Sequence, residues 1–148
     1  MPTDRSTGHA LLALRLTLFL FMLMWALVKV LNPASYGGTE EGPGIFGTFY
    51  GIDFGTGAVL IIGVAQVAFL LAFVAGIAKT VTTGGVLAMN LVTLIASLPT
   101  ILPALAGGGN LLFAASIPVF GASLALFLMR ERDVVLSYGG RREATPGT

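Results

Sequence analysis

Few side chains in this chain have types and spacing suited to chemistry, and most of them lie inside its apolar stretches. Asn90, Thr93 and Ser97 recur at i, i+3 and i+7, which predicts a polar stripe on one side of a helix. With Lys29 and Tyr50, they could frame a pocket for a quinone-like head group. Amides and hydroxyls do not titrate near neutral pH, so they can orient a ligand but not act as ordinary acid–base catalysts. Interhelical hydrogen bonding, worth about 0.6 kcal/mol per contact, is the alternative reading of the stripe.

Two cations, Arg15 and Lys29, lie fourteen residues apart in the first apolar run. This separation is about 21 Å along a helix, less than the roughly 30 Å of bilayer hydrocarbon, so both charges must reach the surface or find partners. We expect Arg15 to extend its charge to the nearer surface. We expect Lys29 to pair with a carboxylate of the following loop, with direct ligand contact as the alternative. The available carboxylates are those of Glu40, Glu41 and Asp53.

Other kinds of catalytic and metal site are excluded by composition. The chain has no cysteine, which excludes disulfides, thiol relays and cysteine-bound clusters, and its one histidine, His9, cannot form a bis-histidine haem site alone. No Ser/His/Asp set and no intramembrane carboxylate pair is present. The net charge of +1 gives no basic surface for nucleic acid. We therefore expect no catalytic residues and no metal site, and the chain alone is not expected to be an enzyme.

The elements that position these residues follow from hydropathy. The chain is 55% hydrophobic, and Lys79 is the one formal charge between Phe54 and Met129. Hydrocarbon requires such a pattern, whereas a water-soluble domain could not keep charge off its surface for so long. Pro99, Pro103 and the glycine-rich run 107–110 separate the last two apolar segments. We predict an all-α membrane protein, a four-transmembrane-helix bundle with helices at about 10–31, 57–78, 85–102 and 111–129.

The basic residues predict the orientation of this bundle. If both termini are cytoplasmic, that side holds seven of the eight Lys and Arg residues, and only Lys29 lies opposite. Residues 31–35 make a poor signal-peptide cleavage site, so the first helix is expected to be retained. The predicted domain covers 10–135. It is flanked by cytoplasmic tails at 1–9 and 136–148, the second of them flexible.

The first outer loop, residues 32–56, is predicted to contain a short interfacial helix. Five residues of its second half fall on one helical face, at i, i+3, i+4, i+7 and i+8: Phe46, Phe49, Tyr50, Asp53 and Phe54. Aromatic rings in such a position are typical of the membrane–water interface. The alternative is a ligand platform.

Small residues predict where the helices pack. Ala65, Ala68, Ala72 and Gly76 form a stripe in the second segment, and Gly121 belongs to a similar set in the fourth. Pro118 is expected to kink the fourth helix in mid-span, since proline removes a backbone hydrogen bond.

Several short sequence features, scattered over about residues 11–135, together resemble those of a known protein family. They are Arg15, Lys29 and Asn32-Pro33, Phe49-Tyr50-Gly51, Asn110-Leu111-Leu112-Phe113, Pro118, and Arg130-Glu131-Arg132-Asp133. On these residues the chain resembles the DoxX-like family of membrane proteins. The resemblance implies a four-helix bundle in the bacterial inner membrane. The family takes its name from a membrane subunit of thiosulfate:quinone oxidoreductase, and some relatives accompany other redox enzymes.

The leading functional hypothesis is therefore an anchoring or quinone-associated subunit of a bacterial membrane redox assembly. Its expected partners are the lipid bilayer and either other membrane subunits or further copies of this chain, and quinone is the one cofactor considered. A first alternative is a purely structural accessory subunit without a ligand, which uses its small-residue faces. A second is a component of a small-molecule transporter, although no intramembrane carboxylate or histidine supplies a proton relay.

Overall fold

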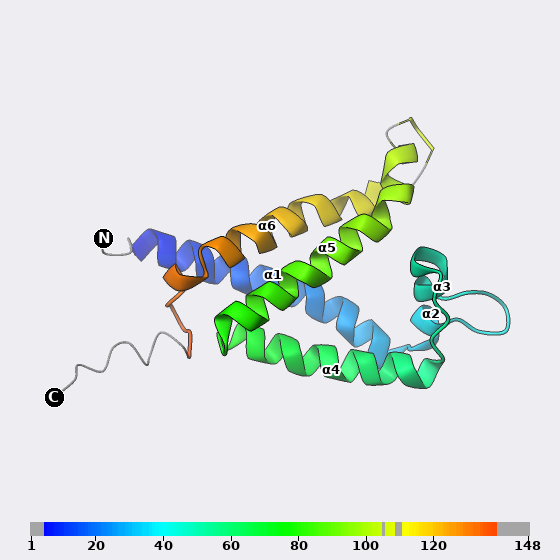
Figure 1. Cartoon of the computed structure of the whole chain (residues 1–148), viewed down its shortest axis with the longest axis horizontal. Coiled ribbons are helices and arrows are strands. Elements are labelled where there is room, and N and C mark those ends of the chain that lie inside the picture. Colours follow the sequence, from blue (N-terminus) through cyan, green and yellow to red (C-terminus); the bar gives the residue numbers. More distant parts are fainter. Residues whose placement is uncertain (1–4, 105, 109–110, 139–148) are drawn as a thin grey trace. The chain divides into compact units, whose positions relative to one another are not determined.

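The protein is built of helices (Figure 1). The computed structural model describes residues 5–104, 106–108 and 111–138. Over these residues the regular elements are all helical, which confirms the predicted all-α class. Three helices are long and apolar enough to cross a membrane: α1 (Arg5–Leu31), α4 (Thr56–Val74) and α5 (Lys79–Ala104). These three helices indicate a membrane protein in contact with lipid.

The chain divides into two compact units. One consists of Met1–Phe19 with Ala72–Thr148, and the other is Leu20–Leu71. Helices α1 and α4 therefore each contribute to both units. The first unit also contains α5, a 3-10 helix η1 (Leu111–Ala115), α6 (Ser116–Leu128) and a second 3-10 helix, η2 (Arg130–Arg132). The second unit contains the short helices α2 (Ala34–Gly37) and α3 (Ile45–Tyr50).

Helix α4 ends earlier, and α5 begins earlier, than hydropathy predicts. The Ile77 amide donates to the Ala72 carbonyl and the Gly76 amide to the Phe73 carbonyl, both at 3.0 Å, which is a Schellman ending with Gly76 at φ +69°. The connection to α5 is completed by Ala78 at φ +46°. A helix end of this kind is set by backbone geometry. The apolar sequence continues through it unchanged, so hydropathy does not reveal where the helix ends. Helix α1 similarly begins at Arg5, inside the predicted tail.

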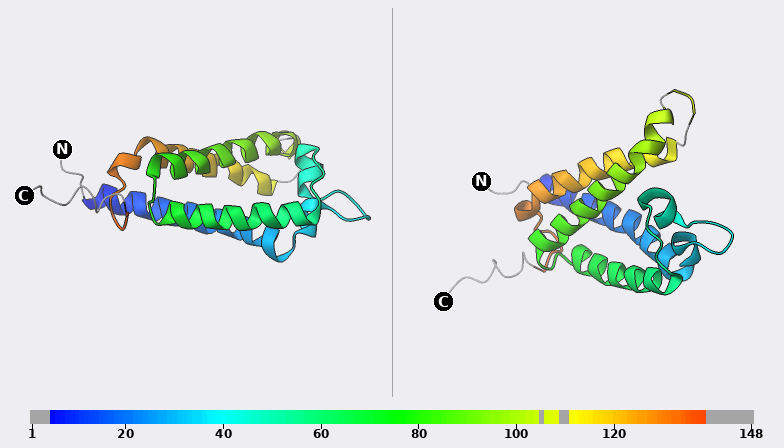
Figure 2. Two further views of the ribbon diagram at one scale, coloured as in Figure 1. Left: turned by 60° about the horizontal axis from the view of Figure 1, so that its bottom comes forward. Right: turned by 45° about the vertical axis from the view of Figure 1, so that its right-hand side comes forward.

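Helices α5 and α6 run side by side in the first unit (Figure 2). Helix α5 continues through Pro99 and Pro103 to Ala104, two residues beyond its predicted end. Gly84 of α5 permits close packing at the other end of the pair, where a Cβ atom would lie 3.3 Å from the Phe127 ring. Gly109 and Asn110 of the predicted turn lie outside the described residues.

The predicted fourth spanning helix is divided. Helix α6 has 13 residues and is preceded by the five-residue η1, so the α-helix begins at Ser116 instead of 111. Pro118 lies in the first turn of α6, a position that tolerates proline because a first-turn N–H has no partner within its own α-helix. The predicted kink stays a prediction. At 1.5 Å per residue, α6 alone covers about 20 Å, less than the hydrocarbon thickness of about 30 Å. The bundle of four spanning helices therefore stays a prediction.

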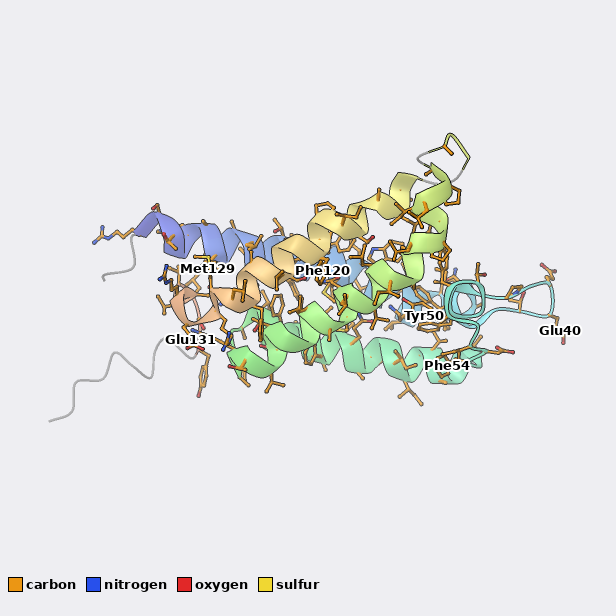
Figure 3. The ribbon with its side chains drawn as sticks, turned by 45° about the horizontal axis from the view of Figure 1, so that its top comes forward. Glu40, Tyr50, Phe54, Phe120, Met129 and Glu131 are labelled. Carbon is orange, nitrogen blue, oxygen red and sulfur yellow. The ribbon has the colours of Figure 1, made fainter. Side chains whose placement is uncertain are left out.

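The loop of the second unit contains the predicted short helix, as α3, and an unpredicted turn of helix, α2. Helix α3 ends at Tyr50 and is capped by Gly51, whose φ of +65° is left-handed. Asp53 and Phe54 therefore lie beyond the helix, and the predicted helical face is too long. Between α2 and α3 the chain forms a tight hairpin closed by Thr39 and Gly42, with the exposed Glu40 at its tip (Figure 3).

Gly44 lets the second arm of this hairpin pack against the first. A Cβ atom at Gly44 would contact the Tyr36 carbonyl and the Gly38 amide nitrogen. We expect Gly44→Ala to lower the free energy of unfolding by about 1–3 kcal/mol, since backbone atoms must shift to admit the methyl group. Gly42→Ala is the matched control, because a Cβ at Gly42 has nothing within 4 Å. Chemical denaturation in detergent micelles measures both, and equal losses would contradict the steric explanation.

Candidate functional site

Lys29 is the most unusual side chain of the second unit. It belongs to α1, one of the helices long and apolar enough to cross a membrane, yet its side chain is only 7% exposed. Its ammonium donates to Oε1 of Gln66 on α4 at 3.0 Å and to the Trp25 carbonyl at 3.4 Å, and it lies 4.3 Å from the centroid of the Tyr36 ring. The approach of α4 depends on Gly63, where a Cβ atom would lie 2.9 Å from the Lys29 Cβ.

The contacts of Lys29 correct the predicted pairing with a loop carboxylate. Glu40, Glu41 and Asp53 are exposed, and in the part of the chain that the structure describes none of them forms an ion pair with Lys29. The ammonium instead has two neutral oxygen acceptors and an aromatic face, which attracts a cation electrostatically. Lys29 therefore connects α1 to α4 and to α2, so it does hold the loop, but through Tyr36.

Aromatic rings extend the Lys29 cluster across the loop. The Phe46 ring of α3 meets the rings of Tyr36, Tyr50 and Phe54 edge-on, at centroid distances of 5.3, 5.7 and 5.3 Å. Burial raises the pKa of Tyr36, with a smaller contribution from Tyr50, so its hydroxyl stays protonated at neutral pH. Lys29 and Tyr50 of the predicted quinone site thus belong to one continuous cluster in this unit. We call Lys29, Gln66, Tyr36, Phe46 and Tyr50 the Lys29 cluster.

The other three predicted site residues lie on α5, in the first unit. Asn90 and Ser97 are buried, but Thr93 is exposed, so the spacing does not produce a uniformly buried stripe. The Thr93 hydroxyl donates to the Met89 carbonyl at 2.9 Å, and the Ser97 hydroxyl donates to the Thr93 carbonyl at 2.7 Å. Bonds of this kind satisfy hydroxyls within their own helix. Ligand contact by Asn90, Thr93 and Ser97 stays a prediction.

Arg15 corrects a second prediction, because it is buried and paired instead of reaching the surface. Its Nη1 donates to Oδ2 of Asp133 at 2.8 Å, and both side chains are 1% exposed. Its Nη2 donates to the carbonyls of Val135 and Leu136 at 2.8 and 3.1 Å. Burial raises the pKa of Asp133, and the positive charges of Arg15 and Lys79 offset part of this rise.

The Arg15–Asp133 pair fastens the segment 133–138 to the first unit. Beyond the pair, the Ser137 hydroxyl donates to the Gly76 carbonyl at 3.4 Å and the Tyr138 amide to the Ala75 carbonyl at 3.0 Å. Residues 136–138 of the predicted flexible tail are therefore bound to α1 and to the α4–α5 turn. The rest of that predicted tail, 139–148, lies outside the described residues.

Sequence reasoning missed this pair, although a signal was present. An arginine inside an apolar helix must reach the surface or find a partner, and Asp133 lies four residues beyond the last apolar segment. In the described parts of the chain, no group of three or more His, Cys, Asp or Glu residues is arranged to hold a metal ion. Comparison of the chain with protein-family models, with curated proteins and with solved structures finds no match.

Proposed function

We propose that the chain is a non-catalytic integral membrane subunit, of the DoxX-like type, in a bacterial inner-membrane redox assembly. In this proposal both termini are cytoplasmic, and the Lys29 cluster receives the head group of a quinone-like molecule. The observation that carries the proposal is the burial of the Lys29 ammonium in an apolar helix with only neutral partners among the described residues. A buried intramembrane cation is costly, and such residues are commonly functional.

The chemistry of the cluster fits a quinone head group. Carbonyl oxygens accept hydrogen bonds, and an ammonium is a stronger donor to them than a neutral group. The contact from Lys29 to the Trp25 carbonyl, at 3.4 Å, is long for a hydrogen bond, so a ligand oxygen would replace it at little cost. The rings of Tyr36, Phe46 and Tyr50 offer flat apolar faces to a planar ligand. When bound, a quinone would supply electron transfer.

The proposed fourth span draws support from the length of the last helical run. Thirteen α-helical residues and five 3-10 residues together rise about 30 Å, the thickness of the hydrocarbon.

A quinone titration tests the binding proposal, because Trp25 is the only tryptophan and lies one turn from Lys29. We expect decylubiquinone to quench Trp25 fluorescence of the purified chain saturably. Lys29→Met should weaken the apparent affinity at least about tenfold, since a charge-assisted hydrogen bond contributes about 1.5–3 kcal/mol. The same variant should keep or raise the thermal midpoint, because it removes a buried charge.

Arg5→Met is the control for this titration, since it removes a positive charge from the same helix at an exposed position. Equal quenching in the wild-type chain and in Lys29→Met would contradict the proposed site.

A purely structural accessory subunit is the second candidate, and one observation favours it. The Lys29 ammonium contacts Gln66 of α4 and the ring of Tyr36 in α2, and so joins α1 to both elements. In that case Lys29→Met would lower the thermal midpoint, and decylubiquinone would quench only in proportion to its concentration in the micelle.

A further inference from the structure

We infer that one end of the α5–α6 pair binds the head group of an anionic phospholipid, between Lys79 and Arg130. This inference concerns the first unit and does not depend on the proposed quinone site. It starts from Arg130, a cation just beyond the end of α6 that contacts the first turn of α5, a helix long and apolar enough to cross a membrane. Lipid head groups meet such a helix at its ends.

The Arg130 guanidinium is held in a defined position. Its Nε donates to the Thr80 hydroxyl at 3.3 Å, its Nη1 donates to the Phe127 carbonyl at 2.8 Å, and its central carbon lies 4.6 Å from the Phe127 ring centroid. The side chain is nevertheless 26% exposed. A guanidinium that is both fixed and accessible is suited to a phosphate group, because little side-chain entropy is lost when the phosphate binds.

Lys79 brings a second cation to the same place. It is the first residue of α5 and directly precedes Thr80, the hydroxyl partner of Arg130. Lys79 also lies close enough to Asp133 to lower the pKa of that carboxyl. Arg130 and Lys79 therefore come from two different elements to the start of α5.

The balance of charge at this end favours an anion. Arg15 and Asp133 neutralise each other in their buried pair. Of the remaining charges, Glu131 lies 3.4 Å from Arg130, but its side chain is 76% exposed and can turn away. Surface ion pairs of this kind contribute little, about 0–1 kcal/mol. Lys79 and Arg130 outnumber Glu131, so a net positive charge remains at the site even without Arg132.

Exposed apolar side chains near these cations favour a lipid as the source of the anion. Val81 is 67% exposed and Leu128 is 68% exposed, one turn or less from Lys79 and Arg130 along the chain. Met129 and Glu131 mark this end of α6 in Figure 3. A phospholipid would place its phosphate at the cations and its acyl chains along the apolar surface to which Val81 and Leu128 belong, so that one molecule would match both features.

Native mass spectrometry of the delipidated full-length chain in mild detergent tests the inference. We expect added phosphatidylglycerol to be retained and to raise the thermal midpoint, and phosphatidylcholine to do neither. Arg130→Gln and Lys79→Gln should each weaken retention about fivefold, which corresponds to the contribution of about 1 kcal/mol per basic residue near a membrane surface. Arg132→Gln is the charge-matched control, because Arg132 is exposed and adjacent but not held, and it should retain the lipid.

Three results would overturn the inference. Equal loss in all three variants would indicate general attraction to net charge. Equal retention of phosphatidylcholine would exclude selection of an anion, and an equal shift of the midpoint with inorganic phosphate would indicate a small-anion site instead of a lipid site. Size-exclusion profiles identify any misfolded variant, and since two independent positions are tested, a fold defect in one leaves the other decisive.

Discussion

Asp133→Ala is expected to lower the free energy of unfolding by about 3–5 kcal/mol, the usual cost of removing one partner from a buried ion pair. Arg15 would then keep a charge that is almost fully buried, with backbone carbonyls as its remaining partners. The segment 133–138 would also lose the contact that begins its attachment to α1. Equilibrium unfolding in mixed micelles, followed by circular dichroism, measures the loss.

The neighbouring carboxylate provides the control for Asp133. Glu131→Ala removes the same charge two residues away, where the side chain is 76% exposed, and should change stability by less than about 1 kcal/mol. The double variant Arg15→Met with Asp133→Leu should recover much of the loss, because an apolar pair of similar volume can replace a buried ion pair. If Asp133→Ala costs no more than Glu131→Ala, the pair does not stabilise the fold.

Tyr36→Ala is expected to cost about 3 kcal/mol or more, comparable to other truncations of large buried aromatic residues. The Tyr36 ring is 5% exposed and lies between the Lys29 ammonium and the Phe46 ring. Its removal leaves a cavity beside the Lys29 ammonium, and this cavity accounts for the expected loss. The same unfolding measurement applies.

Tyr36→Phe separates the ring from its hydroxyl. This variant keeps the packing and the cation–π contact, so we expect a change of no more than about 0.5 kcal/mol. If Tyr36→Phe destabilises the protein as much as Tyr36→Ala, the hydroxyl and not the ring holds the loop. If neither variant changes the stability, the Lys29 cluster does not contribute to the fold.

Hydropathy alone predicts the helical class and the three long apolar helices, because hydrocarbon imposes a nearly charge-free composition on any spanning segment. The helix ends are less predictable. The α4–α5 turn is set by left-handed backbone at Gly76 and Ala78 within a continuous apolar run, so no change of composition marks it. At Pro118 the sequence carries a clear mark, but its meaning is ambiguous. Proline is compatible both with a kink inside a helix and with the first turn of a helix.

The partners of the buried charges depend on tertiary structure. Arg15 and Asp133 are 118 residues apart, and no local pattern connects them. Lys29 pairs with Gln66 instead of a loop carboxylate because α4 packs against α1 at Gly63. Which faces of the two helices meet depends on how each helix is rotated about its own axis, and the local sequence does not fix this rotation. The polar spacing on α5 likewise predicts a helical face but not which of its members is buried.

Purification of the tagged chain from native membranes in mild detergent, with mass spectrometry of co-purifying proteins and extracted quinones, tests the proposed function most directly. The proposal predicts a stoichiometric redox partner and bound quinone in the wild-type sample. It also predicts that Lys29→Met retains the partner and loses the quinone. A homo-oligomer without quinone in both samples would contradict the proposal and favour a solitary structural or transport role.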